Sequence, residues 1–164
     1  GNATDNMAQY AQLSNAGYDA VKQVFPQAKV IVHIHKGNEN NRFRWIFDGL
    51  KDNGGKWDMI GMSLYPTADN WVAQSDDLIS NMNDMVARYK TPVILCETGM
   101  PWDDEDTAFE YLNKLVIRCK AISNSQCEGI LYWEPQSYNG WNGYTLGAFD
   151  GTGKPTKAMD AFQN

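Results

Sequence analysis

The sequence predicts an α/β fold in which four parallel strands alternate with helices. Four short apolar runs, rich in residues that favour strands, recur at regular intervals, and stretches with helical periodicity lie between them. Four parallel strands form either a small open sheet or half of a (β/α)₈ barrel, whose usual length is about 250 residues. The sequence opens on a helical stretch with no strand before it. We therefore expect a half barrel: roughly the last four strands of a TIM barrel with their helices, with the first part absent.

The predicted strands run from Val30 to His35, Met59 to Leu64, Pro92 to Glu97 and Gly129 to Trp133. Apolar residues at steps of three and four predict helices from Asn41 to about Lys51, about Asp76 to Tyr89 and Asp106 to Ile122. A first helix has its apolar stripe at Met7, Tyr10, Leu13, Gly17, Val21 and Val24, and a short helix near Thr156 to Phe162 closes the chain. No linker divides residues 1–164, which we interpret as the C-terminal half of one barrel domain.

Composition narrows the possible partners. The 164 residues carry a formal net charge of −6, whereas nucleic acids and anionic membranes are bound by clustered Lys and Arg. We expect neither as a partner. No apolar run approaches the roughly 18 residues of a membrane span, and no leader is visible. Six Trp and eight Tyr provide rings that suit the apolar faces of sugars, although core and turn packing also uses such rings.

Polar or aromatic residues end all four predicted strands. In parallel α/β folds, active groups gather at the carboxyl ends of the strands. Glu97 ends the apolar run that starts at Pro92, so the scaffold fixes the direction of a carboxylate at the rim. A salt bridge at the rim is the alternative role. His33, Tyr65 and Trp133 lie at the ends of the other three strands.

Five segments resemble one known family. The segment VILCETGMPW, residues 93–102, resembles the seventh-strand nucleophile segment of glycoside hydrolase family 53, the arabinogalactan endo-β-1,4-galactanases, within a large clan of (β/α)₈ retaining glycosidases. Four further segments resemble the same family in the same order: residues 15–21, 32–34, 58–66 and 132–135. The likeness covers essentially the whole chain, aligned with the second half of the family.

The resemblance implies a role for each strand-end residue. Glu97 would be the nucleophile that forms a glycosyl-enzyme intermediate, in a reaction that needs a second carboxyl about 5 Å away. Tyr65 would donate a hydrogen bond to Glu97 and hold it ionised. Trp133 would form an aromatic floor under the sugar, and His33 would line the same subsite. Glu134 would have a structural or substrate-hydroxyl role.

The segment from Gln136 to Asp150 predicts a long rim loop after the last strand, and such loops often carry binding residues. It contains Tyr138, Trp141 and Tyr144, and we expect one or two of these rings, Trp141 above all, to stack on galactose units. Trp71, just beyond the second strand, is another candidate for sugar binding. Packing against a neighbouring loop is the alternative for Trp71.

The general acid of the resembled family belongs to an Asn-Glu pair at the end of its fourth strand, which this sequence lacks. The resemblance therefore places the acid/base upstream of Gly1. The pair Asn38-Glu39 imitates the motif, but it lies in a turn beyond the first predicted strand, so we interpret Glu39 as a loop residue.

No cofactor is expected. The acidic run from Asp103 to Asp106 could bind calcium, although acidic residues also favour the first turn of a helix, which is predicted to begin there. Cys119 and Cys127 flank the turn before the last strand and could form a disulfide in an oxidising compartment, but Cys119 also falls on a buried helical stripe. Cys96 is expected to be a small buried hydrophobe.

Two classes of function are compatible with these patterns. The first is a retaining endo-glycosidase that cuts β-1,4-galactan of pectin side chains, secreted or at the cell surface because its substrate is a polymer. A variant of this first class is another β-glycanase of the same clan. The second class is a non-catalytic carbohydrate-binding half barrel or an inactive fragment. An open-sheet nucleotide or phosphate binder is disfavoured, because no strand end carries a glycine-rich anion loop.

Overall fold

The computed structural model describes residues 5–137 and 141–163. Strands and helices alternate as the sequence predicts, with boundaries that differ by a few residues. The largest difference is at α3, which begins at Trp71 instead of near Asp76. The elements are α1 (Met7–Val24), β1 (Ile31–Ile34), α2 (Asn40–Asp52), β2 (Met59–Leu64), α3 (Trp71–Tyr89), β3 (Val93–Thr98), α4 (Glu105–Lys120), η1 (Ser123–Ser125), β4 (Cys127–Tyr132), η2 (Trp141–Gly143) and η3 (Lys157–Gln163).

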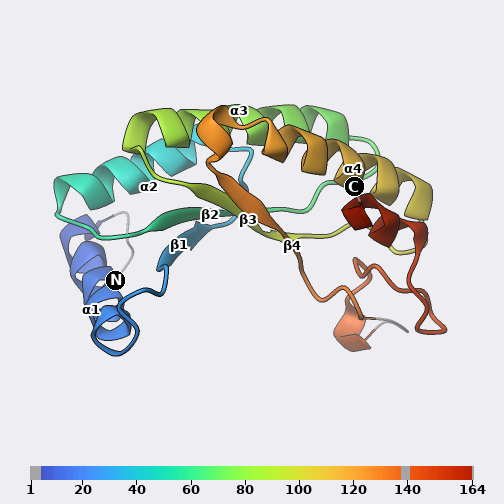
Figure 1. Cartoon of the computed structure of the whole chain (residues 1–164), viewed down its shortest axis with the longest axis horizontal. Coiled ribbons are helices and arrows are strands. Elements are labelled where there is room, and N and C mark those ends of the chain that lie inside the picture. The colour runs from blue at the N-terminus through green and yellow to red at the C-terminus, as the bar shows by residue number, and fades with distance from the viewer. Residues whose placement is uncertain (1–4, 138–140, 164) are drawn as a thin grey trace.

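The four strands form one parallel sheet in the order β1-β2-β3-β4. Because connections between parallel strands are right-handed and the strand order never reverses, all the crossover helices must cover the same face. Figure 1 shows this arrangement, with α2, α3 and α4 in one layer over the sheet. A doubly wound sheet needs a reversal of strand order. The topology is therefore that of half a (β/α)₈ barrel, as predicted.

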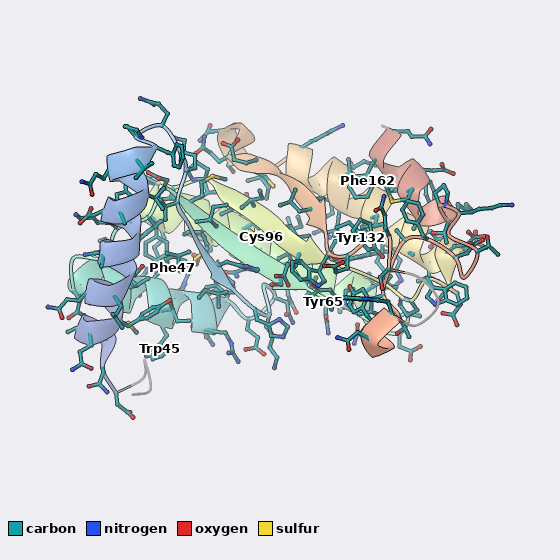
Figure 2. The ribbon with its side chains drawn as sticks, turned by 90° about the horizontal axis from the view of Figure 1, so that it is seen from below. Trp45, Phe47, Tyr65, Cys96, Tyr132 and Phe162 are labelled. Atoms are coloured by element: carbon teal, nitrogen blue, oxygen red, sulfur yellow. The ribbon has the colours of Figure 1, made fainter. Side chains whose placement is uncertain are left out.

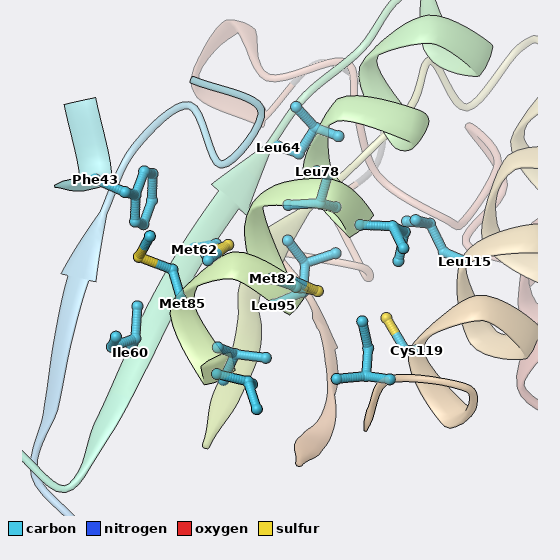
Figure 3. Close-up of a cluster of buried hydrophobic side chains, with 14 of the residues drawn as sticks. Phe43, Ile60, Met62, Leu64, Leu78, Met82, Met85, Leu95, Leu115 and Cys119 are labelled. Carbon is cyan, nitrogen blue, oxygen red and sulfur yellow. The ribbon is translucent and has the colours of Figure 1, made fainter. Parts of the chain in front are cut away.

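The main core lies between the sheet and the layer of three helices (Figure 3). Alternate residues of the central strands point to this layer, where each fully buried aliphatic side chain contributes about 1.5–3 kcal/mol. Large fully buried side chains from both layers include Phe43, Phe47, Leu50, Ile60, Met62, Leu78, Met82, Met85, Leu95 and Leu112. The stripes predicted for α2 and α3 thus face the core.

Most of the stripe predicted for α1 does not. Tyr10 packs against the core, but Leu13 is 75% exposed and Val24 is 66% exposed, and the buried residue of α1 is Ala11. Figure 1 shows α1 at one end of the sheet, beside α2 and away from α3 and α4. The prediction of a buried stripe was wrong within this chain because α1 lies beside the edge strand β1, where the described part of the chain provides no further strand for it to cover.

Candidate active site

Three residues predicted for the site meet at the carboxyl ends of neighbouring strands. Tyr65 donates a hydrogen bond from Oη to Glu97 Oε2 at 3.0 Å, which is the contact that the family resemblance implied. His33 Nδ1 lies 3.9 Å from Glu97 Oε1. The carboxylate of Glu97 and the His33 ring are both partly exposed. Glu97 is therefore held in place from two sides and remains accessible.

An irregularity in the pairing of β3 directs the Glu97 side chain towards His33 and Tyr65, at the carboxyl ends of the strands. Met62 pairs with Leu95, but Ser63 pairs with Glu97, so Cys96 is an extra residue in the ladder. Leu95 faces the core, and strict alternation would turn Glu97 to the same side. A one-residue bulge reverses the alternation and re-aims the side chain that follows it. The predicted direction of Glu97 thus depends on a feature that the sequence does not reveal.

The open face of the sheet has room for Cys96 because Gly61 stands beside it. A Cβ atom on Gly61 would lie 2.7 Å from Cys96 Sγ and 2.7 Å from a methyl group of Ile31. Such distances are too short for real contacts. The absence of a side chain at Gly61 on β2 therefore leaves the space that the Cys96 side chain on β3 occupies.

His33 has a second partner that fixes its orientation. Its Nε2 lies 2.5 Å from Ser63 Oγ, and which of the two atoms donates depends on the ring tautomer. The ring is thereby held between Ser63 on one side and Glu97 on the other. This geometry directs Nδ1 towards the carboxylate.

Tyr65 is maintained as a hydrogen-bond donor. Burial raises the pKa of its phenol, and the hydrogen bond to Glu97 raises it further, so the group stays protonated throughout the neutral range. Tyr144, from the segment after β4, interacts with the Tyr65 hydroxyl. The Tyr144 hydroxyl has a single proton, and the Trp133 carbonyl at 3.3 Å is an alternative acceptor for it. The loop predicted at the rim therefore supports the pair formed by Tyr65 and Glu97.

Tyr132, which the sequence reasoning treated only as part of a strand end, anchors this loop. Its hydroxyl accepts a hydrogen bond from the Met100 amide at 3.1 Å and donates to the Leu146 carbonyl at 2.9 Å. Burial raises the pKa of Tyr132 to about 12, so the proton is retained. The signal in the sequence was weak because a Tyr on an edge strand is ordinary strand composition. Tyr132 pairs with Thr98 and packs against the buried core. Figure 2 shows Tyr132 and Tyr65 towards the same end of the sheet.

The loop closes tightly on the end of β3 at Gly99. A Cβ atom there would lie 2.8 Å from the Leu146 carbonyl oxygen and 3.0 Å from the Tyr144 hydroxyl. Between the same two segments, the Trp102 amide donates a hydrogen bond to the Thr145 carbonyl at 3.2 Å. The glycine two residues after Glu97 is thus a packing requirement of the loop that holds Tyr144.

Two of the predicted sugar-binding rings are accessible. Trp133 is 45% exposed and Trp141 is 58% exposed. The Trp133 amide donates to the Thr98 carbonyl at 2.9 Å, which fixes its backbone beside the end of β3. Glu134 is exposed and adopts a left-handed backbone conformation (φ 46°), and Tyr138 lies outside the described residues.

Trp71 does not present a ring face for sugar. It is 9% exposed, it makes an edge contact with the Tyr111 ring, and the Lys114 ammonium lies 5.2 Å from its ring centroid. Because α3 begins at Trp71, the side chain is placed between α3 and α4 instead of at the rim. Trp71 therefore belongs to helix packing, and the prediction of sugar binding is corrected.

The acidic side chains outside the mouth have partners of their own. Glu39 pairs with Arg42 at 2.7 Å and with Lys36 at 3.1 Å, and these hydrogen bonds lower its pKa. A general acid needs the opposite shift, so Glu39 behaves as the loop residue predicted. In the acidic run before α4, Glu105 accepts from the Lys157 amide at 2.9 Å and Asp106 pairs with the Lys157 ammonium.

The described residues contain no group of three or more His, Cys, Asp or Glu side chains placed to hold a metal ion. Glu105 and Asp106 lie in the first turn of α4, where negative side chains interact favourably with the helix dipole. Their position gives the acidic run a structural role that requires no ion. Among the described residues, no helix is long and apolar enough to cross a membrane.

A strand-end carboxylate on consecutive parallel βα units is the arrangement found at the active face of (β/α)₈-barrel enzymes. Comparison with known proteins makes the assignment specific. The sequence pattern of the family described as "Glycosyl hydrolase family 53" matches residues 1–110. The chain belongs to this family.

Individual relatives agree with this assignment. An uncharacterized protein from Niallia circulans is 26% identical over 94% of this chain and 50% of its own length. An arabinogalactan endo-β-1,4-galactanase from Humicola insolens is 25% identical over 80% of this chain and 46% of its own length. A solved fungal β-1,4-galactanase superimposes with a TM-score of 0.83 at 20% identity, over 98% of this chain and 56% of its own. The chain thus spans about half the length of these relatives.

Proposed function

We propose that this chain is the nucleophile-bearing half of a retaining endo-glycosidase that hydrolyses β-1,4-galactan. The observation that carries the proposal is the placement of Glu97 at the carboxyl end of β3, where Tyr65 donates a hydrogen bond to it at 3.0 Å and His33 Nδ1 lies 3.9 Å away. The family and the galactanase relatives supply the substrate class. Residues 1–164 are then the C-terminal half of one catalytic barrel domain.

In this mechanism Glu97 attacks the anomeric carbon of a bound galactose unit. The Tyr65 hydroxyl donates to one carboxylate oxygen, Oε2, and leaves the other to form the bond to carbon. His33, aligned by Ser63, approaches the same carboxylate. Trp133 offers a ring to the apolar face of the sugar, and Trp141 offers another further along the rim. Glu134 contributes a hydrogen bond to a substrate hydroxyl.

Cleavage also requires a carboxylic acid to protonate the leaving oxygen, about 5 Å from the nucleophile in retaining enzymes. We infer that this group comes from residues outside the chain, because the chain spans about half the length of its galactanase relative. The open face of the sheet, where Gly61, Cys96 and His33 lie, is the side from which the remaining strands would approach. Because the substrate is a plant-wall polymer, the complete protein would act outside the cell, on galactan side chains of pectin.

The nucleophile can be identified by covalent trapping. A 2-deoxy-2-fluoro-β-galactoside with a good leaving group is incubated with the full-length protein, and the labelled peptide is located by mass spectrometry. We expect the tag on Glu97, since an activated leaving group departs without acid catalysis. The Glu97→Gln variant should take no tag, whereas Glu128→Gln, an exposed carboxylate at the start of β4, should be labelled like the wild type.

A tag on another residue would overturn the assignment of Glu97. Release of reducing ends from galactan, measured on the full-length protein, tests the substrate separately. Galactan binding without any release would favour the carbohydrate-binding half barrel. Release from another β-glycan but not from galactan would favour a different member of the clan.

A further inference from the structure

Two thiols lie together at the opposite end of the sheet from Glu97. Cys119 is buried in the last turn of α4, and Cys127 is the first residue of β4, where it pairs with Val93 at the start of β3. Cys127 packs against the buried core that contains Cys119, and the two side chains line one hollow. They are separated in sequence by the short turn that contains η1.

The pair opens into a cavity. Both cysteines line a hollow of about 310 Å³, together with Val116, Lys120, Glu128, Gly129, Ile130 and Phe162. Cys127 is only partly buried, whereas Cys119 lies deeper, on the core side of α4. A small molecule entering the hollow would therefore meet Cys127 first.

The two thiols are chemically unequal. The interaction with Cys119 outweighs the effect of burial and lowers the pKa of Cys127. The same interaction and burial raise the pKa of Cys119. The charged groups nearby are Arg118 and Lys120 on α4 and Glu128 on β4. A thiolate is the nucleophile in disulfide exchange, so Cys127 is the thiol placed to react first.

We propose that Cys119 and Cys127 form a site for thiol–disulfide exchange, in which Cys127 attacks a small disulfide and Cys119 closes an intramolecular disulfide. The co-reactant is a low-molecular-weight disulfide, such as oxidised glutathione. The placement of both side chains on one hollow, access to Cys127 through that hollow and the depth of Cys119 together carry this inference. It is independent of the proposed catalysis.

The exchange proceeds in two steps. In the first step, the Cys127 thiolate attacks one sulfur of the small disulfide, a mixed disulfide forms, and one small thiolate leaves. In the second step, Cys119 loses its proton to solvent, attacks Cys127 Sγ, and displaces the second small thiolate. The protein pair loses two electrons and two protons, and the small disulfide is reduced to two thiols.

The product would fasten the end of α4 to the start of β4. In the reduced chain, the turn between them is held by hydrogen bonds such as that from the Gln126 amide to the Ser123 carbonyl, 3.3 Å. A covalent link across such a turn restricts the unfolded chain and raises stability when the geometry is unstrained. We therefore expect a higher Tm for the oxidised chain than for the reduced chain.

Peptide mapping of the chain tests the proposal directly. The chain is reduced, freed of reductant, incubated with excess oxidised glutathione and alkylated, and a tryptic digest is run without reduction. Trypsin cleaves after Lys120, so Cys119 and Cys127 fall in different peptides, and Cys96 falls in a third. We expect these two peptides to be joined, with the loss of two hydrogen atoms, and Cys96 to be alkylated.

Three wild-type results would contradict the proposal: a lasting glutathione adduct on Cys127, a disulfide that includes Cys96, or no change in mass. Variants then test the order of attack. Cys119→Ser should accumulate the mixed disulfide on Cys127, whereas Cys127→Ser should acquire glutathione at least about tenfold more slowly. Equal rates in the two variants would refute the assignment of Cys127 as the attacking thiol.

Cys96→Ser is the matched control, because burial raises the pKa of the Cys96 thiol and its Sγ lies against Gly61. This variant should form the joined peptide at the wild-type rate. The Tm of the wild-type chain should rise on oxidation, and that of Cys119→Ser should not. A wild-type Tm that falls on oxidation would contradict the proposed fastening of α4 to β4. The wild-type mapping requires no variant and remains decisive if one fails to fold.

Discussion

Glu97 illustrates how one side chain depends on several others that do not touch substrate. The bulge at Cys96 turns it to the open face, Tyr65 holds one of its oxygens, and Tyr144 supports Tyr65 from the rim loop. Hydrogen bonds in such a chain polarise one another, so the donor strength of Tyr65 depends on its own partner. The placement of the nucleophile is therefore a property of a small network.

This network predicts unequal effects for two Tyr→Phe substitutions. Tyr65→Phe removes a hydrogen bond to a charged group, worth about 1.5–3 kcal/mol, so kcat/KM of the full-length protein on galactan should fall roughly tenfold to a hundredfold. Tyr144→Phe removes a bond between neutral groups, and about a fivefold fall is expected. In the double variant, the Tyr144 substitution should have little additional effect. Full additivity in the double-mutant cycle would contradict a role of Tyr144 through Tyr65.

At the scale of secondary-structure elements, ionic contacts fasten the helices where apolar packing is thin. Asp58, just before β2, accepts hydrogen bonds from the Val30 amide at 2.8 Å and from the Tyr18 hydroxyl at 3.1 Å, and it pairs with Lys22 at 2.7 Å. One carboxylate thus joins α1 to the starts of β1 and β2. Because the apolar stripe of α1 is exposed, this contact matters more than an ordinary surface pair.

Asp58 gives the stability of the chain a defined pH dependence. Burial acts to raise its pKa, but hydrogen bonds from Lys22, Val30 and Tyr18 outweigh it, and the net shift is downward. A lowered folded-state pKa contributes stability above the ordinary Asp pKa, near 4, and this contribution is lost as the pH falls through the folded value. Asp58→Asn should therefore lower the free energy of unfolding at pH 7 by about 1–3 kcal/mol.

The loss should shrink as the pH is lowered below about 4, because protonation then weakens the same contacts in the wild type. Urea unfolding at several pH values measures both effects. Asp77→Asn, on the exposed side of α3, is the matched control and should change the free energy of unfolding by less than about 0.5 kcal/mol. An Asp58→Asn effect that does not vary with pH would show that its ionisation is not what stabilises the attachment of α1.

At the scale of the whole molecule, the sequence predicted those features that depend on apolar periodicity and on the residues at strand ends. The alternation of strands and helices, the buried stripes of α2 and α3 and the convergence of Glu97, Tyr65 and His33 were all accessible from local pattern. The bulge at Cys96 and the contacts of Tyr132 and Tyr144 were not, because they depend on register and loop closure. Trp71 failed for a related reason, since a helix boundary moved by a few residues changes what a side chain faces.

The α1 stripe provides a further test at this scale, because it was correctly identified as apolar and wrongly expected to be buried. Leu13 is 75% exposed here, yet in a complete barrel α1 would cover an additional strand. Leu13→Asp should change the free energy of unfolding of this chain by less than about 0.5 kcal/mol. In the full-length protein the same change should cost about 2–5 kcal/mol, since it would bury an unpaired charge where a leucine packed. Val72→Asp, on the exposed side of α3, is the control and should have little effect in either protein. Urea unfolding measures both variants, and equal effects of Leu13→Asp in the two proteins would show that no additional part of the full-length protein covers α1.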